Sequence, residues 1–218
     1  IQQLIENRKW LAMHEFDRLK SIYNFVRDEI LFGYNIDDNI PASKVLKEGF
    51  GQCNTKGTLF MALLRACNIP CRVHGFTIDK KLQNGAMTGI VYKNAPQNVF
   101  HSWVEVYFED KWYELEAFIL DKKYLNNLQK INSSCSGAFC GYGVAVKDFK
   151  NPVIDFNRNN SPRIYCNGSP EIRFSINFKK LCEQFSSALS VLCMIKPILS
   201  SEKAFCKRLC ASNFEFSI

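Results

Sequence analysis

The chain lacks several features that mark whole classes of protein. The longest nearly apolar stretch, residues 188–199, is interrupted by Lys196 and Pro197, whereas a membrane-spanning helix needs roughly 18 apolar residues. The net charge of +7 is not gathered into a dense basic run with interleaved aromatic residues. We therefore expect no membrane span and no nucleic-acid partner.

A convincing zinc pattern is also missing. The chain has ten cysteines but only three histidines, and no C-x-x-C occurs. The closest cysteine pairs are poor zinc signals with so few histidines to complete a site; they are Cys67/Cys71, Cys135/Cys140 and Cys206/Cys210. We expect no metal and no organic cofactor. Reduced thiols and no visible signal segment favour a cytoplasmic protein, and a secreted, disulfide-stapled protein stays open as an alternative.

Length and composition predict one main domain with an extension. Hydrophobic residues make up 47% of the chain and charged residues 22%, which is ordinary for a globular protein. We expect a domain at residues 1–156, with its core at about 17–118. Residues 157–218 become rich in Asn, Ser and Cys, and we expect a divergent or poorly ordered tail there.

One stretch delivers a single cysteine to the start of a helix. Gly49 and Gly51 loosen the loop before Cys53. The apolar residues beyond it recur at helical spacing, so the helix buries one face; they are Leu59, Phe60, Leu63, Leu64 and Cys67. A thiol at a helix N-terminus meets unpaired N–H groups and the positive end of the helix dipole. Both favour the thiolate, which is the nucleophilic form.

Further along, two alternating segments predict a β-hairpin at 101–108 and 111–116. A two-residue loop at Glu109-Asp110 pairs Trp103 with Glu116 and sets His101 diagonal to Glu116. A four-residue loop sets them directly opposite. Both registers place the imidazole and the carboxylate on one face, within reach of each other. A base beside a thiol, and a third group that orients the base, is the arrangement that nucleophilic catalysis requires.

The remaining pattern predicts helices and strands in separate blocks. We expect helices within 1–14, at 17–31 and at 124–130, and strands at 71–78 and 88–92. Residues 133–143 are small and glycine-rich, and predict a loop. Lys56 is expected on the solvated face of the cysteine helix. This order favours an α+β fold in which a sheet packs on that helix.

The three motifs together resemble those of a transglutaminase-like domain, a branch of the papain-like cysteine enzymes. They are G-x-C at residues 51–53, H-x-W-x-E-V-Y at 101–107 and W-x-x-x-E at 112–116. The resemblance implies a catalytic cysteine at a helix N-terminus, packed on an antiparallel sheet that carries His and Glu. Cys53 is then the nucleophile, His101 the base and Glu116 the orienting group. The family more often has Asp-Pro where this chain has Glu116-Ala117, which weakens the assignment of Glu116.

Two further residues receive candidate roles beside this triad. Gln52 donates to the oxyanion from its side chain, or is an ordinary surface residue. Trp103 packs beside the imidazole and excludes water, or is simply a core tryptophan. The oxyanion donor expected on geometric grounds is the backbone N–H of Cys53.

The resemblance implies cysteine-dependent acyl transfer on amide or peptide carbonyls through a thioester. Peptidase, amidase or deamidase activity is favoured over cross-linking, and the substrate is a protein or peptide. No D-x-D-x-D-G loop of a calcium site is present. The alternative is a catalytically inactive module that keeps the fold for binding or as a scaffold.

Overall fold

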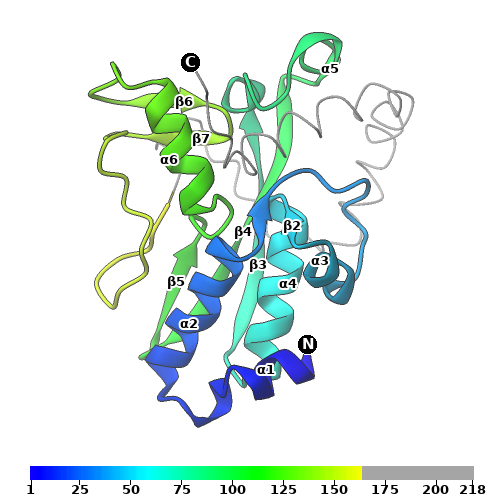
Figure 1. The fold of residues 1–218 in the computed structure, drawn as a ribbon, viewed down its shortest axis with the longest axis vertical. Helices are drawn as coiled ribbons and strands as arrows, with labels where there is room; N and C mark the ends of the chain where they lie inside the picture. The colour runs from blue at the N-terminus through cyan, green and yellow to red at the C-terminus, as the bar shows by residue number, and fades with distance from the viewer. Residues whose placement is uncertain (164–218) are drawn as a thin grey trace, which may run out of the picture.

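A three-stranded antiparallel sheet, packed against one helix, is the centre of the molecule (Figure 1). The computed structural model describes residues 1–163. The elements follow one another as α1 (Gln2–Asn7), η1 (Trp10–Ala12), α2 (Glu15–Asp28), β1 (Leu31–Phe32), α3 (Ala42–Glu48), β2 (Phe50–Gly51), α4 (Cys53–Ala66), β3 (Cys71–Asp79), η2 (Lys80–Gln83), α5 (Gly89–Asn94), β4 (Asn98–Phe108), β5 (Lys111–Leu115), α6 (Lys122–Ile131), β6 (Phe139–Gly141) and β7 (Val144–Val146). This α+β arrangement, with the cysteine helix on an antiparallel sheet, confirms the expected fold class.

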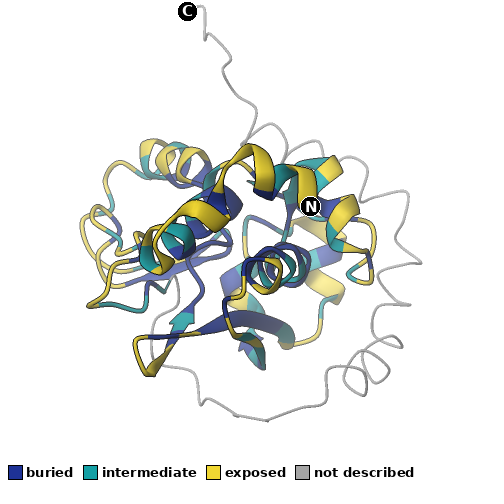
Figure 2. Ribbon diagram, turned by 90° about the horizontal axis from the view of Figure 1, so that it is seen from below, coloured by how far each residue is buried: buried dark blue, intermediate teal, exposed yellow. Residues whose placement is uncertain are grey.

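The main core lies between α2, α4 and one face of the sheet. Even-numbered residues of β4, such as Val104 and Val106, are fully buried in the same cluster as Leu63 of α4 and Ile22 of α2. Period-2 alternation in the strand and helical spacing in both helices bring these apolar faces together. In Figure 2 the inward faces of these elements are buried, and exposed residues lie on their outer sides.

The strand order β3-β4-β5 places β4 in the middle of the sheet. On one side β4 pairs with β3, where Phe76 lies opposite His101. On the other side β4 pairs with β5, from Val104 opposite Leu115 to Phe108 opposite Lys111. Glu109 and Asp110 have φ of 48° and 59°, so they form a two-residue turn with both central residues left-handed. The shorter of the two expected hairpin loops is therefore confirmed.

A short parallel pairing ties the end of α2 to the loop before Cys53. β1 pairs with β2, with Leu31 opposite Phe50 and Phe32 opposite Gly51. A Cβ built on Gly51 would lie 2.5 Å from Thr55 Oγ1, so only glycine lets the loop approach α4 this closely. Pairing and close approach together fix where α4 begins.

Lys56 corrects one expectation. The sequence predicts it on the solvated face of α4, but its side chain is fully buried. Its ammonium donates to the backbone carbonyls of Arg27 at 3.2 Å, Ile30 at 2.6 Å and Ile119 at 2.9 Å. A buried charge is tolerable when its donors are satisfied in this way, and the three acceptors come from parts of the chain that a helical pattern does not reveal.

The structure confirms some of the other predicted helices, strands and loops and contradicts others. The strand expected at 88–92 is wrong, since Gly89–Asn94 forms helix α5. The glycine-rich stretch 133–143 is a loop in its first part but contains strand β6. The expected helices at 17–31 and 124–130 are present as α2 and α6, with shifted ends.

The first residues of the expected tail pack on the domain. Tyr113 Oη donates to the Arg158 carbonyl at 2.9 Å, and the Glu116 and Ala117 N–H groups both donate to the Pro162 carbonyl. The division at residue 156 stays a prediction, and the rest of the expected tail, residues 164–218, lies outside the described residues. Within residues 1–163 no helix is long and apolar enough to cross a membrane.

Candidate functional site

Cys53 is the first residue of α4 and is half-buried. The turn before it is held by the Gln52 N–H, which donates to Thr55 Oγ1 at 3.0 Å. The thiol therefore sits where unpaired helix N–H groups and the positive end of the helix dipole favour negative charge. Of the described cysteines, Cys53 alone occupies a helix N-terminus.

His101 and Glu116 meet across the hairpin. The His101 Nε2 and Glu116 Oε1 atoms lie 2.8 Å apart, and the two residues are 5% and 1% exposed. The register places Glu116 one residue past the end of β5, in the position opposite Trp103 and diagonal to His101. This is the geometry that the two-residue loop predicts. A buried carboxylate at this distance holds the imidazole in one orientation.

The imidazole also meets the thiol. Burial lowers the pKa of His101, but the negative charge of Cys53, a hydrogen bond with Cys53 and the bond with Glu116 together raise it to about 10. These interactions therefore favour the protonated, imidazolium form of His101. The structure thus brings Cys53, His101 and Glu116 together from α4, β4 and the residue after β5; their catalytic roles stay a prediction.

Gln52 is engaged in the loop rather than free at the surface. Its amide oxygen accepts from the Asn35 N–H at 2.9 Å, and its amide nitrogen donates to Asp38 in a short contact. One N–H of that nitrogen remains for another acceptor. The predicted oxyanion role of Gln52 therefore stays a prediction, with most of its side-chain capacity used to hold the loop.

Trp103 lies two residues beyond His101 on the same face of β4. Its ring stacks on His74 at 4.7 Å and contacts Phe76 at 4.4 Å. Phe76 in turn lies edge-on to the His101 ring at 5.0 Å. Trp103 Nε1 is buried without a hydrogen-bond partner in the described part of the chain. The rings therefore form one aromatic cluster, and Phe76 is the member that contacts the imidazole. The water-excluding role of Trp103 stays a prediction.

Three polar residues of the site were missed from sequence. Asp38 in the loop after β1, Asn54 of α4 and Ser102 of β4 form a chain of hydrogen bonds beside the candidate triad. Asn54 and Ser102 each directly follow a candidate catalytic residue. That adjacency was visible in the sequence, but their contact depends on how α4 packs on β4.

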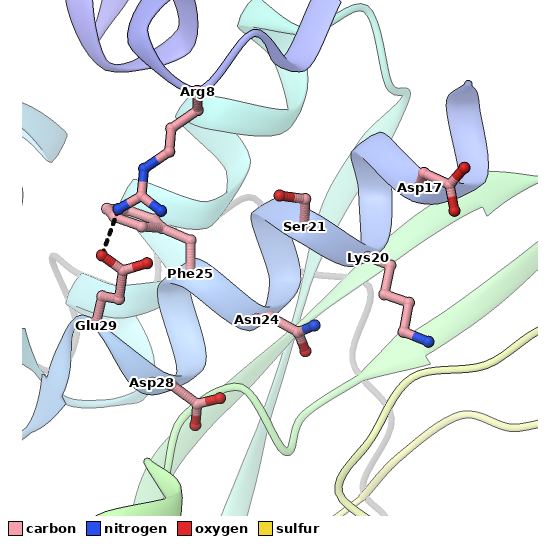
Figure 3. A pocket seen from close by; sticks show the side chains of 8 residues that line it. All are labelled: Arg8, Asp17, Lys20, Ser21, Asn24, Phe25, Asp28 and Glu29. Atoms are coloured by element: carbon pink, nitrogen blue, oxygen red, sulfur yellow. Dashed lines mark hydrogen bonds and ion pairs between the residues drawn. The ribbon is translucent and has the colours of Figure 1, made fainter. Parts of the chain in front are cut away.

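The region 1–163 contains no group of three or more His, Cys, Asp or Glu side chains arranged to hold a metal ion. One hollow of about 410 Å³ runs along α2, lined by side chains from Arg8 to Glu29 (Figure 3). Arg8 donates to Glu29 there at 2.5 Å. No member of the candidate triad lines it, so we assign it no part in the chemistry.

Comparison with known proteins identifies a family for this part of the chain. The model of the transglutaminase-like superfamily matches residues 5–117, which contain all three members of the candidate triad. The protein YebA of Bacillus subtilis, described as uncharacterized, is 30% identical over 111 residues. That alignment covers 46% of this chain and 15% of YebA, so the chain spans only a small part of its relative.

A solved structure is also similar in part. The crystal structure of a candidate cysteine protease from Cytophaga hutchinsonii is 22% identical, with a TM-score of 0.36, over 49% of this chain and 32% of that one. So low a score adds nothing to the assignment. Since the family model matches more than half of the 218 residues, the chain belongs to the transglutaminase-like superfamily.

Proposed function

We propose that the protein is a cysteine-dependent enzyme that transfers acyl groups from amide or peptide carbonyls through a thioester. The observation that carries the proposal is the buried 2.8 Å contact between Glu116 and His101, and the pKa of this same imidazole is raised by its interaction with Cys53. A nucleophile, a base and a group that orients the base are the minimum set for this chemistry.

In the first half-reaction the Cys53 thiolate attacks the carbonyl carbon and a C–S bond forms. The resulting oxyanion is stabilised by the Cys53 backbone N–H at the start of α4. As the C–N bond breaks, His101 gives its proton to the departing nitrogen, and ammonia or an amine leaves. The products of this step are a thioester on Cys53 and a neutral imidazole.

In the second half-reaction a water molecule attacks the thioester while His101 takes its proton. The C–S bond then breaks, the acid is released, and the thiolate and imidazolium are restored. Because Nε2 is bonded to Glu116, Nδ1 is the ring nitrogen available to exchange protons with the thiol and the substrate. Glu116 fixes that orientation and stabilises the positive ring.

An amine in place of water would give cross-linking instead of hydrolysis. We favour hydrolysis of a peptide bond or of a glutamine-type side chain, following the family resemblance, with a protein or peptide as substrate. No metal and no organic cofactor takes part in these steps. The aligned region covers only 15% of YebA. The proposal therefore concerns the activity of this domain and not that of a longer protein.

The second candidate function is a non-catalytic module that binds a partner with the same fold. Its support is Glu116-Ala117 in place of the Asp-Pro more usual in the family. Against it stands the contact that the longer glutamate still makes with the imidazole.

The test is mass spectrometry of a glutamine-containing peptide library treated with the wild type and with Cys53→Ala. Each incubation is run with and without an added primary amine. Chain cleavage, conversion of Gln to Glu, or amine incorporation by the wild type alone would each support acyl transfer and identify its kind. Identical product spectra for the two proteins would reject the enzyme and favour the binding module.

A further inference from the structure

A buried hydrogen bond joins the two elements that carry the candidate nucleophile and base. Asn54 follows Cys53 on α4, and Ser102 follows His101 on β4. Ser102 Oγ donates to Asn54 Oδ1 at 2.8 Å, and these residues are 2% and 9% exposed. The bond therefore links the two backbones one residue beyond each reactive side chain, in a place that solvent hardly reaches.

The Asn54 amide can face in only one direction. Its nitrogen donates to Asp38 Oδ2 at 2.7 Å, and its oxygen accepts from Ser102. A flipped amide would set its oxygen against the Asp38 carboxylate, placing two acceptors together. Asp38 Oδ1 also accepts from the Gln52 side chain, so one carboxylate holds the residues on both sides of Cys53.

This arrangement leads to an inference that rests on the proposed function. We propose that the hydrogen bond between Asn54 and Ser102, oriented by Asp38, is a positioning element that keeps the Cys53 thiol and the His101 imidazole in register. The two reactive groups belong to different elements, so their separation depends on how α4 sits on β4. Apolar packing tolerates small sliding, whereas a hydrogen bond of this geometry does not. A misplacement of about 1 Å can cost about a hundredfold in rate.

The groups that face the His101 ring are few. Cys53 approaches it from α4, Glu116 from the residue after β5, and the Phe76 ring from β3. Asn54 Oδ1 also accepts a long hydrogen bond of 3.7 Å from the Cys53 sulfur, beside the much shorter bond of 2.8 Å from Ser102. Without Ser102 this oxygen would be left to the Cys53 thiol alone, which would draw the thiol away from the imidazole.

If the bond between Asn54 and Ser102 only stabilised the fold, its loss would lower stability and leave the pH dependence of Cys53 reactivity unchanged. The test therefore measures that pH dependence. The rate of Cys53 alkylation by iodoacetamide is measured by mass spectrometry as a function of pH in the wild type and in Ser102→Ala. The matched control is Ser21→Ala, which removes another 2.8 Å serine bond, with the Trp10 indole N–H, far from the site. A free thiol with a pKa near 8.5 is only about 1% thiolate at pH 6.5.

We expect Ser102→Ala to slow alkylation of Cys53 at pH 6.5 by about tenfold or more, because the thiolate loses its cation. At pH 9.5 and above the rates should converge, and Ser21→Ala should follow the wild-type profile throughout. If Ser102→Ala keeps the wild-type pH profile of alkylation, the inference about the positioning bond is overturned. The proposed function survives that result as long as Cys53 of the wild type is activated. A wild-type Cys53 that is not activated at all rejects the proposed function itself.

Asp38→Asn provides a second variant that creates no cavity. Asparagine offers one acceptor where the carboxylate offers two, so either Asn54 or Gln52 loses its partner. We expect its alkylation profile to lie between those of the wild type and Ser102→Ala. If Ser102→Ala does not fold, a wild-type profile for Asp38→Asn overturns the inference.

Discussion

Replacing Glu116 by glutamine tests the group that orients the imidazole with the smallest change in shape. Glu116 is 1% exposed, its Oε1 lies 2.8 Å from His101 Nε2, and its Oε2 has no partner within the described residues. Glutamine fills the same volume and keeps one acceptor, but it carries no charge. Glu116→Gln therefore removes the charge assistance of one hydrogen bond and little else.

The size of the effect follows from that bond. A hydrogen bond to a charged group is worth about 1.5–3 kcal/mol, against about 1 kcal/mol for a neutral one. The difference, about 0.5–2 kcal/mol, corresponds to roughly one pKa unit of the imidazole, since one unit is 1.36 kcal/mol. The pKa of His101, which is raised to about 10 in the wild type, should therefore fall by roughly one unit in Glu116→Gln.

Nitrogen-15 NMR of selectively labelled histidine measures this directly, because the chain has only three histidines to assign. The matched control is Glu105→Gln, because Glu105 lies on the same strand as His101 and its Oε1 is 3.1 Å from Nδ1 of His74 on β3. This control should alter the His74 signals and leave the midpoint of His101 unchanged. A His101 midpoint that is the same in Glu116→Gln as in the wild type would refute the reasoning.

Three further changes have outcomes that the structure specifies. The pKa of His101 in the folded protein is about 10, above its ordinary 6.5. Its contribution to stability is therefore complete below about pH 6.5 and is lost as the pH rises through about 10. In urea titrations the difference in free energy of unfolding between the wild type and His101→Gln should shrink across that range. Lys56→Met leaves three buried carbonyls without their donor and should lower the free energy of unfolding by about 3 kcal/mol or more, whereas a loss below about 1 kcal/mol would contradict that account. Asp121 caps α6 and also accepts from the Phe32 N–H at 2.8 Å, so Asp121→Ala should cost about 2 kcal/mol, and an unchanged thermal midpoint would count against the cap.

The parts of the fold that depend on local periodicity could be predicted from sequence. Helical spacing after Cys53 predicts α4, and the alternation that follows His101 predicts a strand. The turn at Glu109-Asp110 then brings His101 and Glu116 together, because a two-residue loop leaves one register. Three short stretches of sequence, the helix after Cys53, the strand from His101 and the turn at Glu109-Asp110, are therefore enough to predict the main geometry of the candidate site.

The parts that depend on distant contacts could not be predicted. Nothing local to Lys56 says that three carbonyls from α2, its following residues and the segment after β5 will surround its ammonium. In the same way Asp38 lies in a polar loop, and its bonds to Gln52 and Asn54 exist only once that loop folds over α4. Polar residues satisfied by long-range partners leave no period in the sequence.

The central claim is that Cys53 is an activated thiol, and the most direct test compares it with other thiols of the same molecule. The protein is treated briefly with iodoacetamide at pH 6.5, and alkylation of each cysteine is followed by peptide mass spectrometry. Cys140 is exposed and Cys135 half-buried, so both report ordinary reactivity. We predict that Cys53 reacts at least about tenfold faster than either, and that His101→Gln removes the difference. A Cys53 that reacts no faster than Cys140 would contradict the account.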